Sequence, residues 1–69
     1  MDVMQKYIKS LRNGNSYEWI ANNGHELNKY ELIDIVKELD YAIHFFSGTD
    51  GTPIYQFAAE NLEDTYKEE

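Results

Sequence analysis

The side chains best suited to chemistry in this 69-residue chain are carboxylates and aromatic rings that share one side of a predicted helix. They are Glu31, Asp34, Glu38, Tyr41 and Phe45. At about 100° per residue these positions fall together, and carboxylates three or four residues apart on a helix are separated by roughly 5–6 Å. Such a face can bind cationic groups of a partner. It can equally be a solvated face whose two rings are covered by another segment, and both interpretations stay open.

The negative charge is concentrated in the second half of the chain. Thirteen acids face six bases, for a net charge of −7. The first 29 residues hold four bases and three acids, whereas residues 30–69 hold two bases and ten acids. This balance disfavours nucleic acid and anionic membranes as direct ligands, and it favours a basic protein surface as the partner. The predicted partner-binding residues are Glu31, Asp34, Glu38, Tyr41, Phe45, Glu60, Glu63 and Asp64.

Residue patterns that would indicate catalysis or a cofactor are not found. The chain has no Cys, so neither disulfides nor a Cys-based zinc site can form. His25 and His44 are far apart in the sequence, and there is no phosphate-cradling Gly loop, no HExxH motif and no nucleophile with a nearby base. We therefore expect no enzymatic activity, no metal site and no cofactor.

The acidic and aromatic positions lie in the longest periodic segment, residues 28–46. Asn28 is a good N-cap, and Glu31 three residues later fits a variant of the capping box. Apolar residues then recur at alternating spacings of three and four, which predicts an amphipathic helix of about five turns. This helix is expected to supply much of the core through Leu32, Ile35, Leu39, Ala42 and Phe46, with Val36 and Ile43 widening the stripe.

Shorter helices are predicted on both sides of this segment. Asp2 should cap a first helix that runs to about residue 12 and ends at Gly14, which can take a positive φ. Ser16 should cap a short helix over about 16–21, held to the core by Trp19 and Ile20. After a polar loop over 47–51, Thr52 and Pro53 form a strong helix start, and the last helix should run to about residue 66, with residues 67–69 frayed.

The predicted fold is therefore one all-α domain, residues 1–69, built as a small bundle of three main helices and one short helix. A competing interpretation pairs residues 41–46 with 54–57 as a β-hairpin, because these segments are rich in Tyr, Ile and Phe. Which of the two forms between residues 41 and 57 stays open at this point.

The small size of the chain indicates that its stability comes either from helix packing or from a partner, of which a second copy is one form. A domain of about 60 residues buries only about 60% of its unfolded surface and is marginal alone. Aromatic residues are enriched at protein interfaces, so we expect Tyr41 and Phe45 to lie at a contact, with a homodimer as one form of it. No apolar run approaches the roughly 20 residues that span a bilayer, and no apolar signal segment follows Met1.

A very small, Cys-free, Tyr-rich and strongly acidic helical chain resembles the phage and mobile-element inhibitors of bacterial defence, the antirestriction and anti-CRISPR proteins. Residues 38–44, Glu-Leu-Asp-Tyr-Ala-Ile-His, look like helical stretches in such proteins. Several of these inhibitors mimic DNA, with carboxylates standing where phosphates would. The resemblance lies in size, composition and helix pattern, and it transfers no individual functional residue.

The resemblance implies an inhibitor that works in the cytoplasm of a bacterial host. It would bind a basic, nucleic-acid-binding protein, such as a CRISPR or restriction nuclease, through the acidic helical face. The alternative is a small regulatory adaptor or antitoxin-like module that binds another protein without mimicking DNA. A third interpretation is a structural or dimerising domain whose acidic face only keeps it in solution.

Overall fold

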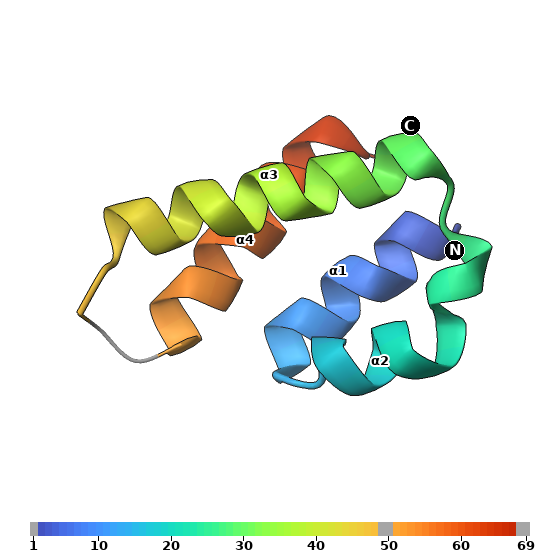
Figure 1. Ribbon diagram of the computed structural model, residues 1–69, viewed down its shortest axis with the longest axis horizontal. Coiled ribbons are helices and arrows are strands. Elements are labelled where there is room, and N and C mark those ends of the chain that lie inside the picture. The colour runs from blue at the N-terminus through green and yellow to red at the C-terminus, as the bar shows by residue number, and fades with distance from the viewer. Residues whose placement is uncertain (1, 49–50, 68–69) are drawn as a thin grey trace.

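All regular secondary structure in the described part of the protein is helical. The computed structural model describes residues 2–48 and 51–67. These residues form α1 (Val3–Asn13), α2 (Ser16–Asn23), the 3₁₀ turn η1 (Gly24–Glu26), α3 (Lys29–Phe45) and α4 (Gly51–Thr65) (Figure 1). The predicted all-α bundle of three main helices and one short helix is confirmed. The alternative hairpin is wrong, because residues 41–45 belong to α3 and residues 54–57 belong to α4.

The ends of α1 and α3 follow the predicted capping chemistry. The Asp2 side chain accepts a hydrogen bond of 2.9 Å from the amide of Gln5. Gly14 ends α1 with a φ of 78°, which costs a residue without Cβ little. At α3 the capping box is complete, because the Asn28 side chain accepts from the Glu31 amide at 2.8 Å and the Glu31 side chain accepts from the Asn28 amide at 2.9 Å.

Other helix boundaries differ from the predicted ones. Ser16 is the first residue of α2 and not its cap, and Asn15 precedes it without a capping side-chain bond. The reason is local. The Asn15 amide donates to the Ser10 carbonyl at 3.0 Å and so completes the C-terminal cap of α1. Asn15 therefore both closes α1 and precedes α2, and no linker separates the two helices. The helix α2 continues to Asn23 before η1.

The boundaries of the last helix agree with prediction to within a residue or two. The helix α4 begins at Gly51, one residue before the predicted Thr52 cap, and it ends at Thr65. In the predicted 47–51 loop, residues 49–50 lie outside the described ranges, as do residues 68–69 of the tail that was expected to fray.

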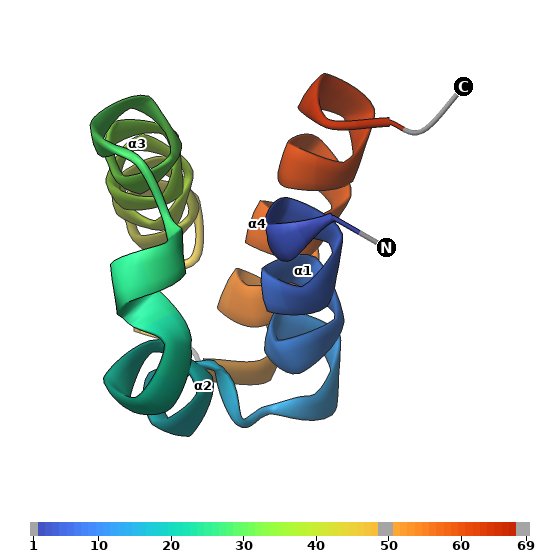
Figure 2. The same ribbon diagram turned by 90° about the vertical axis from the view of Figure 1, so that its right-hand side faces the viewer.

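The core forms chiefly between α1 and α4. Figure 2 shows these helices side by side, with α3 on the other side and α2 below α3. The largest fully buried side chains are Tyr7, Met4, Leu11 and Leu62, of which three belong to α1. The Tyr7 ring meets Trp19 edge to face at 5.7 Å, so Trp19 ties α2 to the core as expected. The complete set of buried apolar residues is Met4, Tyr7, Ile8, Leu11, Leu27, Ile35, Ala42, Ala58, Ala59 and Leu62.

The expectation that α3 supplies much of the core is wrong. Only Ile35 and Ala42 of this helix are buried, and Leu39 and Phe46 are half-buried. Three residues of the predicted inward stripe are exposed: Leu32 by 39%, Val36 by 65% and Ile43 by 52%. The physical reason is that α3 packs mainly on α4, and one neighbouring helix covers only part of so wide an apolar arc.

Leu62→Ala tests this assignment of the core. Because Leu62 is fully buried, the truncation should lower the free energy of unfolding by about 2–5 kcal/mol. Urea unfolding followed by circular dichroism measures the change. Tyr17→Ala is the control, since Tyr17 is 88% exposed and should shift stability by no more than about 0.5 kcal/mol. Equal midpoints for the two variants would show that Leu62 is not a core residue.

Candidate functional site

The three predicted binding carboxylates of α3 are half-buried and take part in the fold. Glu31 is engaged in the capping box of its own helix. Asp34 accepts a hydrogen bond from the Tyr66 hydroxyl. Glu38 has one carboxylate oxygen, Oε2, that is buried and has no hydrogen-bond partner among the described residues. These side chains therefore do not form a freely exposed acidic row. Among the described residues, the Glu38 Oε2 atom is buried with its hydrogen-bonding capacity unused.

Tyr66 links the end of α4 to two other helices. Its hydroxyl donates to Asp34 on α3, and its backbone carbonyl accepts from the Gln5 side chain on α1. Burial raises the pKa of Tyr66 to about 12, and the hydrogen bond to Asp34 and the charges of Asp34 and Glu31 act in the same direction. The phenol therefore stays protonated at neutral pH and remains a donor to the carboxylate.

The carboxylates of α4 point away from the core, and one of them is paired. Glu63 forms an ion pair with Arg12 of α1 at 2.8 Å, a contact that is exposed and therefore weak. Glu60 and Asp64 are exposed and lie four residues apart, on the same side of α4. Glu63 lies on the α1 side of α4, so the eight predicted residues do not form one continuous surface.

Aromatic rings form a cluster where α3 and α4 pack together. Tyr41 and Phe45 meet edge to face at 5.2 Å, and both contact the ring of Phe57, at 5.7 Å and 5.5 Å. Phe46 closes the cluster at 5.4 Å from Phe57. Tyr41 and Phe45 remain 49% and 60% exposed. The separation of Phe57 from Tyr41 in the chain gave no sign of this contact.

Three of these rings, the Glu38 carboxylate of α3 and two carboxylates of α4 make up what we call the acidic–aromatic face. Phe57 precedes Glu60 by three residues and Asp64 by seven, so the three share one side of α4. On α3, Glu38 precedes Tyr41 by three and Phe45 by seven. The face therefore consists of Glu38, Tyr41, Phe45, Phe57, Glu60 and Asp64. It offers anionic oxygens beside ring surface, an arrangement that can hold guanidinium or ammonium groups.

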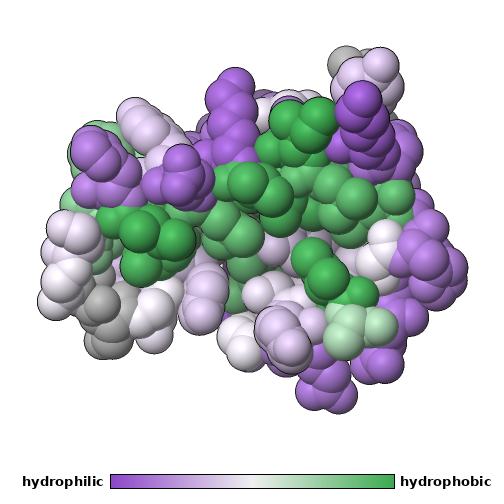
Figure 3. Space-filling model, in the orientation of Figure 1, coloured by the Kyte–Doolittle hydropathy of each residue, from purple (hydrophilic) through white to green (hydrophobic). Residues whose placement is uncertain are grey.

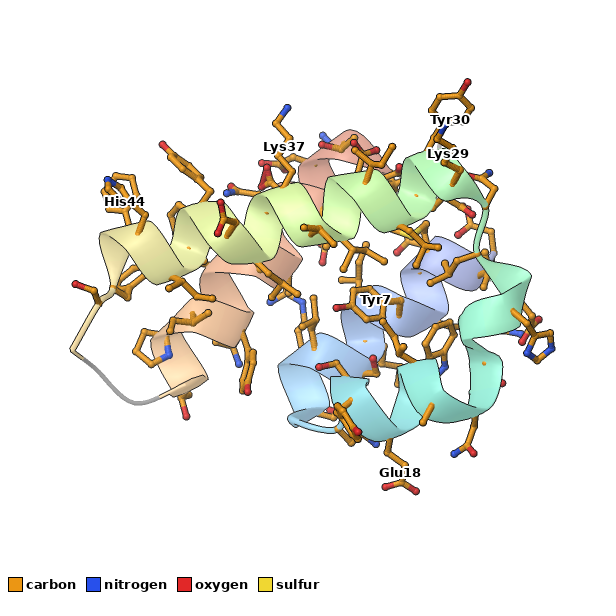
Figure 4. The ribbon with its side chains drawn as sticks, viewed as in Figure 1. Tyr7, Glu18, Lys29, Tyr30, Lys37 and His44 are labelled. Carbon is orange, nitrogen blue, oxygen red and sulfur yellow. The ribbon has the colours of Figure 1, made fainter. Side chains whose placement is uncertain are left out.

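A second surface, absent from the predictions, runs along the outward side of α3. Figure 3 shows hydrophobic surface continuing along this helix on the face turned to the viewer. Lys29, Leu32, Ile33, Val36 and Lys37 line a shallow, almost wholly apolar depression there. Figure 4 shows Lys29, Lys37 and His44 projecting from α3, while Glu18 projects from α2 on the opposite side of the molecule. The sequence feature that could have indicated this surface is the apolar arc of α3, which is wider than one neighbouring helix can cover.

The described residues contain no group of three or more His, Asp or Glu side chains placed to hold a metal ion. In the same part of the chain no helix has the length and apolar character needed to cross a bilayer.

Comparisons of the chain with models of known protein families, with curated proteins and with solved structures find no match.

Tyr66→Phe tests the tie between α3 and α4. The variant keeps the ring and loses the hydroxyl that Asp34 accepts from, so stability at pH 7 should fall by about 1–2 kcal/mol. Because the folded pKa is raised from 10.0 to about 12, the neutral phenol stabilises the fold fully below pH 10. This contribution is lost as pH rises from 10 to 12.

Urea unfolding at pH 7 and pH 11 measures both effects. The stability difference between wild type and Tyr66→Phe should shrink from pH 7 to pH 11. Tyr17→Phe removes a hydroxyl from a fully solvated ring and serves as the control. Tyr7, whose pKa burial also raises to about 12, is present in all three proteins, so its titration cancels. A pH-independent difference would contradict the assigned role of Tyr66.

Proposed function

We propose that this protein is a non-enzymatic inhibitor or adaptor that binds a basic surface of another protein through the acidic–aromatic face. The observation that carries this proposal is the exposed pair Tyr41 and Phe45. Both rings contact Phe57, and they lie about one and two turns after Glu38, whose carboxylate has a buried oxygen without a partner among the described residues. Binding hot spots are enriched in aromatic and Arg side chains. An Arg of the partner can stack on these rings and at the same time donate to Glu38.

The charge of the molecule supports a basic partner. The chain carries −7 overall, and Glu60 and Asp64 are exposed on the same face of α4 as Phe57. Opposite charges steer the encounter of two proteins and raise the association rate at low salt. A nucleic-acid-binding host protein, such as a defence nuclease, presents a surface of this kind.

The internal use of two carboxylates supports the version of the proposal without DNA mimicry. A mimic needs a regular row of free carboxylates at phosphate-like spacing, whereas Glu31 caps its own helix and Asp34 accepts from Tyr66. DNA mimicry remains the second candidate, because the second half of the chain holds ten acids against two bases. The cytoplasm of a bacterial host is the compartment in which we propose that either version acts.

Charge reversal tests the electrostatic part of the proposal. The partner is first captured from bacterial lysate on the immobilised protein and identified by mass. The double variant Glu60→Lys/Asp64→Lys should then slow association at least about tenfold at low salt, because steering is lost. Association of wild type should also slow as salt rises, since charges are screened over about 8–10 Å at physiological ionic strength.

Glu18→Lys/Glu26→Lys is a matched control, because it changes the net charge equally at exposed positions in α2 and η1. It should slow association by no more than about threefold if the effect is local. Equal rates for the two double variants would contradict a localised acidic site. Competition by nucleic acid for the same partner surface separates the two candidates: mimicry requires it, and simultaneous binding rules mimicry out.

Phe45→Ala tests the aromatic part of the proposal. Truncating an anchor ring should speed dissociation by about tenfold or more, as hot-spot residues do. Association should change little, because the net charge is unaltered. Surface plasmon resonance with the captured partner gives both rates. Tyr17→Ala removes a still more exposed ring from α2 and should leave dissociation unchanged. Identical rates for the two variants would argue against a ring anchor at Phe45.

A further inference from the structure

The outward side of α3 has the sequence pattern of a coiled-coil seam with no helix packed on it. Lys29, Ile33, Val36, Asp40 and Ile43 follow one another at spacings of four, three, four and three residues, which is the period of helices that pack as coiled coils. All five are exposed. We call these five residues the outer strip.

The outer strip exposes more apolar side chain than is expected of a helix face that contacts only water. Ile33 is 50% exposed, Val36 65% and Ile43 52%, with Leu32 beside them at 39%. Scattered single apolar residues on a surface need no explanation, but a contiguous patch marks an interaction site. The continuous hydrophobic surface along α3 in Figure 3 is of this second kind.

We propose that the outer strip packs antiparallel against the outer strip of a second copy of this protein. In this arrangement, with the two-fold axis between positions 34 and 35, Ile33 faces the partner's Val36 and Lys29 faces the partner's Asp40. The two-fold axis repeats both contacts. The interface therefore has two apolar layers at its centre and one Lys29–Asp40 ion pair at each end. A helix of 17 residues is about 25 Å long, which is enough for all four layers.

The order of charges selects the second copy and the antiparallel direction. A parallel pair would set Lys29 against Lys29 and Asp40 against Asp40, whereas the antiparallel pair sets each base against an acid. The outer side of α3 is also locally less acidic than the rest of the molecule, since two of the six bases of the chain, Lys29 and Lys37, project there. Two copies can thus meet on this side in spite of the charge of −7 on each.

This self-association differs from the homodimer expected from the sequence. Tyr41 and Phe45 are not part of the outer strip, so they stay free in the dimer. The acidic–aromatic face therefore remains available to a different partner, and the inference does not depend on the proposed function.

Charge exchange between copies tests the proposed register. Wild type should be dimeric by sedimentation equilibrium at micromolar concentrations. Lys29→Glu alone and Asp40→Lys alone should each raise the dimer dissociation constant at least about tenfold, because each sets like charges against one another. An equimolar mixture of the two variants should dimerise again, since every opposed pair is then of opposite sign. The double variant Lys29→Glu/Asp40→Lys should also dimerise like wild type.

Val36→Glu tests the apolar layers and should give a monomer. Tyr17→Glu introduces the same charge at another exposed position and, as the control, should stay dimeric. The helical circular dichroism signal of every variant verifies that it is folded. A wild type that stays monomeric at high micromolar concentration overturns the inference. Binding of a different protein to the outer strip of such a monomer overturns it as well. A wild-type dimer that both single charge variants leave intact overturns the antiparallel register.

Discussion

The packing of α1 on α4 is the interaction on which the other elements depend. Met4, Tyr7 and Leu11 of α1 are almost fully excluded from solvent in a chain that has no disulfide and, within its described residues, no group of metal ligands. On α4 the corresponding residues are small or compact, namely Ala58, Ala59 and Leu62. Because alanine has a small side chain, these residues leave room between the two helices for the large side chains of α1.

The remaining helices are held to this pair in different ways. Trp19 of α2 packs its ring edge to face on Tyr7. The long helix α3 is buried only at Ile35 and Ala42, and it gains further attachment through the bond from Tyr66 to Asp34 at one end and the rings around Phe57 at the other. A helix attached along one side and at both ends necessarily presents its opposite side to solvent.

This one-sided attachment gives α3 two exposed surfaces with different chemistry. The acidic–aromatic face lies along the seam with α4 and combines carboxylates with half-exposed rings. The outer strip lies on the other side and combines Ile33, Val36 and Ile43 with charges of both signs. Binding at one surface leaves the other accessible, so a dimer of this protein would present two copies of its acidic–aromatic face to a partner.

The sequence alone determined both ends of α1 and the start of α3, because those signals act over three or four residues. The Asp2 cap, the turn at Gly14 and the capping box of Asn28 and Glu31 all form between near neighbours in the chain. The same short-range pattern identified the acidic positions and the two exposed rings, Tyr41 and Phe45.

Only the tertiary structure decided which side of α3 is covered. Apolar residues occupy a wide arc of this helix, and the sequence period is equally consistent with burying Val36 or exposing it. The outcome depends on where α4 lies, and α4 packs on both α1 and α3. The partners of the carboxylates are likewise remote, since Tyr66 is 32 positions from Asp34 and Arg12 is 51 positions from Glu63. Contacts over such separations follow from the packing of whole helices, and no local pattern in the chain encodes them.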